Sequence, residues 1–312
     1  CITIMLKMHD TVVAYMDICG FSDLVKCDSR KAAEILEYIG KMMDSACKLD
    51  IKDSTPFEWN QFSDSIFFYW RTRDDGLNPP LLILFLKIVA TVQYEAFVRF
   101  GLPVRGAISK GQIYTSRTAV GMAVLNSYKM ESQTAEWFRV LIDDSVLSLL
   151  PNCVRDDYIH QYDKNHTLNF LYATSLNREG MGLREVLSSF RDRIVADVYD
   201  ESTRSFKLKT YEESSSQYVP FKPEETGTVA QFCKASRLEN RYGMLINYYN
   251  NVCFDYNLRE LRLDARPTHG ATVTTIRRIQ ELQQEYPKYN KLLRFNIDSL
   301  LSNFKNRKRH NS

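Results

Sequence analysis

Residues 11–22 read TVVAYMDICGFS, a β-rich run that ends in Asp17 and is followed by a turn-like segment. The run predicts a strand that stops at this aspartate. A helical pattern begins at Asp23 and continues to about Lys48, with apolar residues at spacings of three and four: Ile35, Ile39, Met43 and Ala46. This spacing predicts an amphipathic helix that covers a sheet.

The next segments complete an α+β pattern. Two aromatic runs, 57–62 and 65–70, are separated only by Ser63 and Asp64, which predicts a tight hairpin with Asp64 at its tip. The following stretches favour a helix, a strand, a helix and a strand, at 81–100, 102–114, about 123–137 and 138–142. The order of elements predicts helices packed on one face of a mainly antiparallel sheet.

Composition limits the possible functions. The chain has 312 residues, 44% hydrophobic and 25% charged, which excludes a disordered or fibrous protein. Its 41 basic and 38 acidic residues nearly cancel, so we expect no nucleic-acid partner. Seven cysteines, an odd number without a CxxC pair, indicate reduced thiols and a cytoplasmic location. The apolar stretch 81–92 is shorter than the roughly 20 residues of a membrane span, so we expect a buried helix and no direct membrane contact.

The second half of the chain has a different character. The segment 201–226 is rich in Ser, Glu, Lys and Thr, which predicts a surface insertion or linker. Helical patterns follow at 237–256, 274–286 and 291–304. We therefore expect residues 1–200 to form a core and 227–312 a helical extension that packs on this core or on a partner subunit.

Two aspartates stand out because HExxH, GxSxG and GxxxxGK[ST] motifs are all missing from the sequence. Asp17 ends the first strand and Asp64 tops the hairpin, so neighbouring strands would bring both to one sheet edge. Two carboxylates there can hold two magnesium ions, whose remaining positions suit the phosphates of a nucleoside triphosphate. Each aspartate alone is more often a helix cap or a turn former; their combination indicates the metal site.

Phosphate contacts are also predicted close to these aspartates. Amide groups of Gly20, Phe21 and Ser22 stand at a helix start, where they can hold negative charge, and Gly20 permits a tight turn. Arg105 and Lys110 flank the glycine-containing strand and are candidate triphosphate contacts, although basic residues at strand ends are more often solvated.

These motifs together resemble the class III nucleotidyl cyclases. The first metal motif appears as DICGFS, the second as NQFSDSIFF, the glycine strand as VRGAISKGQIY and the dimer-facing helix as GMAVLNSYKMES, over roughly residues 11–145. The resemblance implies a ferredoxin-like catalytic core within 1–200, and a homodimer with active sites at the interface. It also implies that Asp17, Asp64 and the carbonyl of Ile18 hold two Mg²⁺ or Mn²⁺ ions.

The implied reaction is that of a phosphorus–oxygen lyase. The ribose 3′-hydroxyl attacks the α-phosphorus in line, pyrophosphate leaves, and the product is a 3′,5′-cyclic nucleotide. Base choice departs from the purine patterns. Asn60 stands where adenylate members carry Lys and guanylate members Glu, and Thr118 stands where many adenylate enzymes carry Asp.

Neutral groups at these two positions favour a pyrimidine base, with Tyr15 and Trp59 narrowing the pocket. The chain is similar in this respect to the bacterial anti-phage pyrimidine cyclases of Pycsar systems, which make cyclic UMP or cyclic CMP. That similarity implies UTP or CTP as substrate, and a downstream effector reached through the product. An adenylate or guanylate cyclase with a divergent pocket, and a nucleotide-binding regulatory module without catalysis, stay open as alternatives.

The transition-state residues of the family are also altered. Its ribose-positioning Asn falls at Leu125, although a shifted helix register would bring in Asn126. Its transition-state Arg falls at Lys129, which lacks the bidentate fork of arginine. Arg139 on the following strand is the alternative phosphate contact.

Overall fold

The computed structural model describes residues 7–48, 56–72, 78–115, 119–135, 138–162, 164–176, 182–203, 205–207, 209–212, 217–220 and 229–264. The chain divides into two compact units, Cys1–Phe190 and Arg191–Ser312. The helices predicted at 274–286 and 291–304 lie outside the described residues, as do Thr118 and Trp137.

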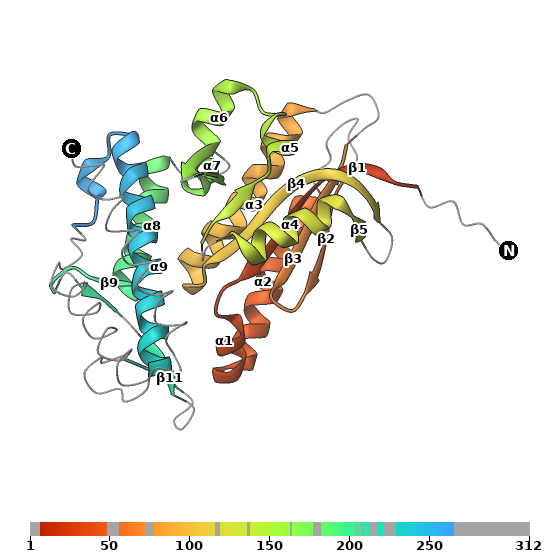
Figure 1. Cartoon of the computed structure of the whole chain (residues 1–312). Coiled ribbons are helices and arrows are strands. Elements are labelled where there is room, and N and C mark those ends of the chain that lie inside the picture. Colours follow the sequence, from red (N-terminus) through yellow and green to blue (C-terminus); the bar gives the residue numbers. More distant parts are fainter. Residues whose placement is uncertain are drawn as a thin grey trace. The chain divides into compact units, whose positions relative to one another are not determined.

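The first unit is built on an eight-stranded sheet, in which seven strands follow the order β2-β3-β1-β4-β6-β8-β7 and β5 pairs with β4 (Figure 1). The strands are β1 His9–Ile18, β2 Phe57–Phe62, β3 Ser65–Arg71, β4 Val104–Thr115, β5 Ala119–Gly121, β6 Val140–Ile142, β7 Ile159–Tyr162 and β8 Asn165–Leu168. Every pairing is antiparallel except β4 with β6. The predicted mainly antiparallel α+β fold is confirmed.

Helices connect these strands. They are α1 Phe21–Cys27, α2 Ser29–Cys47, α3 Pro79–Phe100, α4 Met122–Gln133, α5 Asp144–Leu147, α6 Asn152–Tyr158, α7 Phe170–Ser175 and α8 Leu183–Asp197. The single helix predicted over 23–48 is instead two, because the chain leaves helical geometry at Asp28, where φ is −155°. The Asp28 side chain accepts a hydrogen bond from the Lys31 amide at 2.9 Å and so caps α2.

Helices cover both faces of the sheet, not one face as predicted. On one face, Phe68 of β3 stacks on Phe85 of α3 with ring centroids 4.5 Å apart, and Trp59 of β2 donates from Nε1 to Asp44 of α2 at 3.0 Å. On the other face, α4 packs through Ala123 in a buried cluster with Val13, Tyr69 and Ile113. Alternate residues of each strand therefore face different helices.

Helix α3 is the core helix of this unit. It is long and apolar enough to cross a membrane by length and composition, but 72% of its most apolar window is buried inside the protein. This agrees with the buried helix predicted from 81–92. The helix ends at Gly101, whose φ of 70° is the left-handed conformation that glycine adopts without strain.

The described part of the second unit contains two short hairpins and a long helix. Strand β9 Tyr199–Asp200 pairs with β10 Ser205–Phe206, and β11 Lys209–Glu212 pairs with β12 Gln217–Pro220, within and beside the predicted surface insertion. Helix α9 Val229–Asp255 begins before the predicted 237 and is followed by the 3₁₀ turn η1 Arg259–Leu261. Tyr249 of α9 donates its hydroxyl hydrogen to the carbonyl of Leu261 at 2.8 Å, which ties this turn to the helix.

Candidate active site

The two candidate metal-binding aspartates lie at one edge of the sheet, meaning the end at which strand β1 finishes and strand β4 begins. Strand β1 lies between β3 and β4, so Asp17 is opposite Ser65 on one side and Arg105 on the other. The Ile18 amide donates a hydrogen bond to the carbonyl of Asp64 at 3.2 Å. The end of β1 and the tip of the β2–β3 hairpin are therefore joined, as the hypothesis of a shared site requires.

The turn after Asp17 is fixed by backbone geometry. The Cys19 amide donates to the carbonyl of Pro103 at 2.8 Å, and Gly20 has φ 82°, in the left-handed region. Phe21 is buried and Ser22 is exposed. Helix α1 starts here but has only seven residues. The turn therefore acts mainly by redirecting the chain after Asp17, and the dipole of so short a helix adds little.

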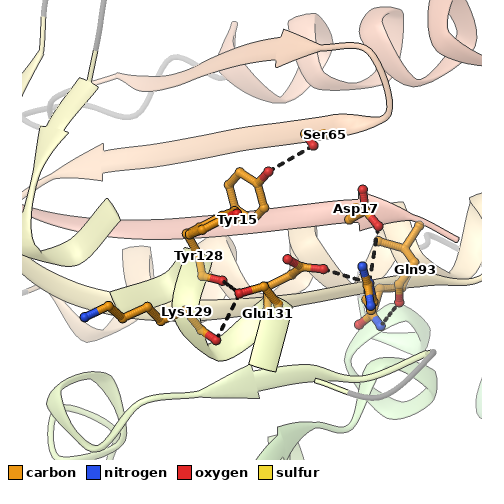
Figure 2. Close-up of polar contacts among 10 residues, drawn as sticks. Tyr15, Asp17, Ser65, Gln93, Tyr128, Lys129 and Glu131 are labelled. Atoms are coloured by element: carbon orange, nitrogen blue, oxygen red, sulfur yellow. Dashed lines mark hydrogen bonds and ion pairs between the residues drawn. The ribbon is translucent and has the colours of Figure 1, made fainter. Parts of the chain in front are cut away.

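Arg105 links Asp17 to a third carboxylate. Its Nε lies 3.2 Å from Asp17 Oδ2 and 2.7 Å from Glu131 Oε1 of α4; these ion pairs are the dashed lines that leave Asp17 and Glu131 in Figure 2. The Asp17 side chain is 21% exposed, whereas that of Glu131 is only 4% exposed. The cluster is thus open to solvent on the Asp17 side and closed on the helix side.

The electrostatics of this cluster are those of crowded negative charge. Burial raises the pKa of Asp17; the charge of Asp64 raises it further, and Arg105 only partly opposes these effects. Burial also raises the pKa of Glu131, with Asp17 and Asp64 adding to the rise against Arg105. Burial lowers the pKa of Arg105, but Glu131, Cys19 and Asp17 raise it above its ordinary value overall.

A divalent cation fits this imbalance. Asp17 and Glu131 both pair with the Arg105 guanidinium, and the charge of Asp64 acts on both carboxyl groups, so these four groups carry a net charge of −2 when all are ionised. Oxygen ligands of this type are those that Mg²⁺ and Mn²⁺ prefer. Among the described residues, no group of three His, Cys, Asp or Glu side chains is arranged around a common point. Asp17 and Asp64 would thus need water or substrate oxygens to complete the coordination of an ion.

Tyr15 lies beside this cluster on the same face of β1. Its hydroxyl donates to Ser65 Oγ at 3.0 Å, and its ring meets the ring of Tyr128 of α4 edge-on, with centroids 5.5 Å apart (Figure 2). Burial raises the pKa of Tyr15, and the nearby charges of Glu131 and Asp17 also raise it. Tyr15 therefore connects the hairpin next to Asp64 with α4.

Asn60 lies on the same sheet face as Asp17. It is opposite Phe67, which is itself opposite Tyr15, so alternation along the strands puts Asn60 on the face of Tyr15 and Asp17. Asn60 is exposed. Trp59 points to the other face, where it packs over Gly40 of α2, so the expectation that Trp59 narrows a base pocket is wrong.

Of two further predicted basic contacts, Lys110 lies away from the aspartates and Arg139 lies near them. Lys110 is five residues beyond Arg105 on β4 and on the opposite face, where its Nζ pairs with Asp10 at 2.8 Å. The structure does not bring Lys110 to the aspartates. Arg139 precedes β6, its carbonyl accepts from the Gly106 amide at 2.9 Å, and its side chain is buried. Arg139 is therefore at the same sheet edge as Arg105.

The residues of α4 divide between two faces. Ala123, Ser127 and Glu131 are buried against the sheet, whereas Leu125 and Lys129 are exposed on the opposite side. Figure 2 shows the Lys129 side chain extending away from Asp17 of its own chain. The helix is continuous from Met122 to Gln133, and Asn126 on it is half-buried.

Sequence analysis missed two residues that support the edge. Glu131 is an acid on the buried stripe that Ala123 and Ser127 define at spacings of four, a pattern that could have revealed it. Gln93 of α3 is buried and its Nε2 donates to the carbonyls of Val104 at 3.1 Å and Phe138 at 2.9 Å. A glutamine inside an apolar helix gave no comparable signal, because its partners are backbone atoms of distant strands.

Comparison with known proteins gives structural similarity only. No family model matches the chain, and no curated protein matches it. The adenylyl cyclase CyaB from P. aeruginosa is similar over 52% of this chain and 92% of its own, with 13% identity and a TM-score of 0.39. The catalytic core of a rhodopsin-guanylyl cyclase with converted specificity, in complex with ATPalphaS, gives 13% identity over 52% of this chain and 93% of its own, with a TM-score of 0.36.

A class III adenylyl cyclase-like ATP-binding protein from Pseudomonas aeruginosa is 11% identical over 59% of this chain and 40% of its own, with a TM-score of 0.36. These solved structures are cyclases or cyclase-like. Their identities and TM-scores are too low for any activity to be carried over to this chain. Its function is inferred below from its own residues.

Proposed function

We propose that the chain is a pyrimidine nucleotidyl cyclase that converts UTP or CTP into the 3′,5′-cyclic nucleotide and pyrophosphate. Asp17, Asp64 and the carbonyl of Ile18 would hold two Mg²⁺ or Mn²⁺ ions. The observation that carries the proposal is the convergence of Asp17 and Asp64 at one sheet edge, within a cluster whose carboxylates outnumber its guanidinium. Such an edge suits a polyphosphate only when divalent cations are present.

The protein's own residues would supply position and charge. When bound, the two ions would acidify the ribose 3′-hydroxyl and stabilise the charge that builds up on the phosphates. Asp17 and Asp64 hold fixed positions because backbone hydrogen bonds join their strands. Arg139 lies at the same edge as a candidate phosphate contact, and the turn at Gly20, Phe21 and Ser22 lets phosphate oxygens approach the backbone.

The exposed side of α4 supports a homodimer. Large apolar side chains are exposed there and on the neighbouring strand and hairpin: Met122, Leu125, Tyr128, Val120 and Phe62. A second copy would bury this surface. Lys129 points away from Asp17 of its own chain, which is the direction needed if it serves the site of a partner.

The pyrimidine assignment rests on Asn60. This neutral amide is exposed on the sheet face that also carries Asp17 and Tyr15, and it can donate or accept hydrogen bonds to a base edge. A charged Lys or Glu at this position would favour a purine pattern. The proposed biological role is second-messenger synthesis in the cytoplasm during anti-phage defence, with an effector that responds to the product; it extends the resemblance to the Pycsar cyclases.

A second candidate is a nucleotide-binding regulatory module without turnover. It is favoured by Leu125, an apolar residue where catalysis in this family uses an amide, and by the hold of Arg105 on Asp17. An adenylate or guanylate cyclase with an unusual pocket is the remaining alternative for the same site.

One experiment separates these functions. The purified chain is incubated with each of ATP, GTP, CTP and UTP and with Mg²⁺ or Mn²⁺, and products are identified by mass spectrometry. We expect cyclic UMP or cyclic CMP together with pyrophosphate. A dominant cyclic purine would refute the pyrimidine assignment, and triphosphate binding without pyrophosphate release would support the regulatory module. Asp17→Ala and Asp64→Ala are the controls, and both should be inactive but folded.

A further inference from the structure

We propose that Arg105 is an internal counter-cation that leaves Asp17 when a divalent ion binds, and that Glu131 of α4 receives it. Glu131 is then a positioning residue for the metal site, although it does not bind the metal. The inference rests on the proposed function, because it concerns the same divalent-ion site.

The contacts of Arg105 show that it is shared unequally. Its Nε–H donates a hydrogen bond to Asp17 Oδ2 at 3.2 Å. Glu131 Oε1 is closer to the same nitrogen, at 2.7 Å, but is buried and accepts no hydrogen bond. The single hydrogen on Nε is therefore directed at Asp17, and Glu131 is left with unused accepting capacity.

Charge disfavours binding of the guanidinium and a divalent ion to Asp17 at the same time. A guanidinium 3.2 Å from the carboxylate and a divalent ion on that carboxylate repel one another strongly in a half-buried site. Glu131 offers the only described carboxylate within ion-pair distance of Arg105 besides Asp17. A small rotation of the guanidinium gives the buried Glu131 its missing hydrogen bond and frees Asp17.

Removing the receiving group should leave Arg105 on Asp17. With glutamine at position 131, the guanidinium has lost its second anionic partner and stays with Asp17, where it competes with the ion. A group that only orients the ligands of a metal changes affinity by roughly ten- to a hundredfold in other proteins. We expect Glu131→Gln to weaken Mn²⁺ binding by about tenfold.

The test is Mn²⁺ binding to the 312-residue chain without nucleotide, measured by calorimetry and by electron paramagnetic resonance. Four proteins form a cycle: parent, E131Q, R105Q and E131Q/R105Q, each checked for folding by its melting temperature. We expect E131Q to weaken binding in the parent background and to have little effect when Arg105 is already glutamine. Equal effects in both backgrounds would overturn the proposal, because Glu131 would then act only through its charge.

A second measurement uses the parent protein, which avoids any variant that fails to fold. With ¹⁵N-labelled arginine, Mg²⁺ should shift the Nε–H resonance of Arg105, which R105Q identifies. An unchanged resonance at saturating Mg²⁺ would overturn this relay, the proposed transfer of Arg105 from Asp17 to Glu131. Mn²⁺ binding that is present in the parent and lost in Asp17→Asn upholds the metal site independently, so failure of the relay and failure of the proposed function are distinguished.

Discussion

The Ile18 amide donates to the carbonyl of Asp64 at 3.2 Å, which joins the last residue of β1 to the tip of a hairpin 46 positions further along the chain. The approach of the two chain segments that carry Asp17 and Asp64 is thus fixed by the backbone. An active site of this kind is organised before any ligand arrives.

The ionised Asp17 carboxylate should lower the stability of the metal-free fold, although metal binding requires it. Its pKa is raised, so the folded protein binds the Asp17 proton more tightly than the unfolded chain does. The stabilisation that protonation gives is present below the ordinary carboxyl pKa and is lost as pH rises through the raised value. At neutral pH without metal, we expect the melting temperature of Asp17→Asn to equal or exceed that of the parent. Any gain should vanish in acid, where Asp17 of the parent is protonated.

The same variant should lose stabilisation by Mn²⁺, as measured by thermal melting with and without the ion. Asp10→Asn is the matched control, because Asp10 is on the same strand but pairs with Lys110 at the far end. It should keep the Mn²⁺ response. A melting temperature of Asp17→Asn well below the parent would contradict the expected sign.

Gly106 should be indispensable to the pairing of β1 with β4. A Cβ at this position would lie 2.5 Å from the Tyr15 carbonyl oxygen and 3.0 Å from Met16 Cγ, so the backbone would have to move. We expect Gly106→Ala to lower the free energy of unfolding by about 1–3 kcal/mol in urea denaturation. Gly111→Ala on the same strand meets its nearest atom, Ala123 N, at 3.4 Å, and should cost much less.

Phe85 should be the main aromatic anchor of α3 on the sheet. It is fully buried and stacks on Phe68, and the centroid of its ring is 6.1 Å from that of the Phe57 ring. Phe85→Ala should lower the free energy of unfolding by about 3–5 kcal/mol. Val25 of α1 is 43% exposed and lies outside the proposed dimer surface, so Val25→Ala should leave unfolding almost unchanged; similar losses in both variants would contradict the assigned core.

Sites shared between two copies predict complementation. If Asp17 of one copy and Lys129 of the other complete each site, Asp17→Asn and Lys129→Ala should each be inactive alone. When equal amounts of the two variants are mixed and allowed to re-associate, about half of the dimers are heterodimers. Each heterodimer has one intact site and one site that carries both changes, so about a quarter of the parental activity should return. No recovery in a mixture shown to exchange subunits would rule out shared sites.

The apolar side of α4 should determine association. Leu125→Arg places a charge among exposed apolar side chains that a second copy would cover. We expect a monomer in analytical ultracentrifugation, with an unchanged melting profile at low concentration. Val25→Arg, at an exposed apolar residue of α1, is the control and should leave association intact.

The first half of the fold could be predicted because its signals are local. The run before Asp17 and the two aromatic runs around Ser63 and Asp64 specify strands and a tight turn through neighbouring residues alone. The break at Asp28 could not be foreseen, since an aspartate inside a periodic run is common on exposed helix faces. Helix α4 on the second face also required knowledge of how the chain returns across the sheet.

The site was harder to predict than the fold. Arg105 was named as a phosphate contact, but its two carboxylate partners belong to different elements. Lys110 was named beside it, although residues 105 and 110 are an odd number apart on one strand and must face opposite sides. Alternation could have corrected that expectation. The spacing of four from Ala123 and Ser127 marks Glu131 as buried, but its contact with Arg105 joins a helix to a strand and cannot be read from the sequence.

Gln93 has a consequence for the order of assembly. One amide group from α3 donates to the carbonyl of Val104, the first residue of β4, and to that of Phe138, two residues before the parallel strand β6. We expect α3 to dock before these strands can align, so the parallel rung should form late when the chain refolds.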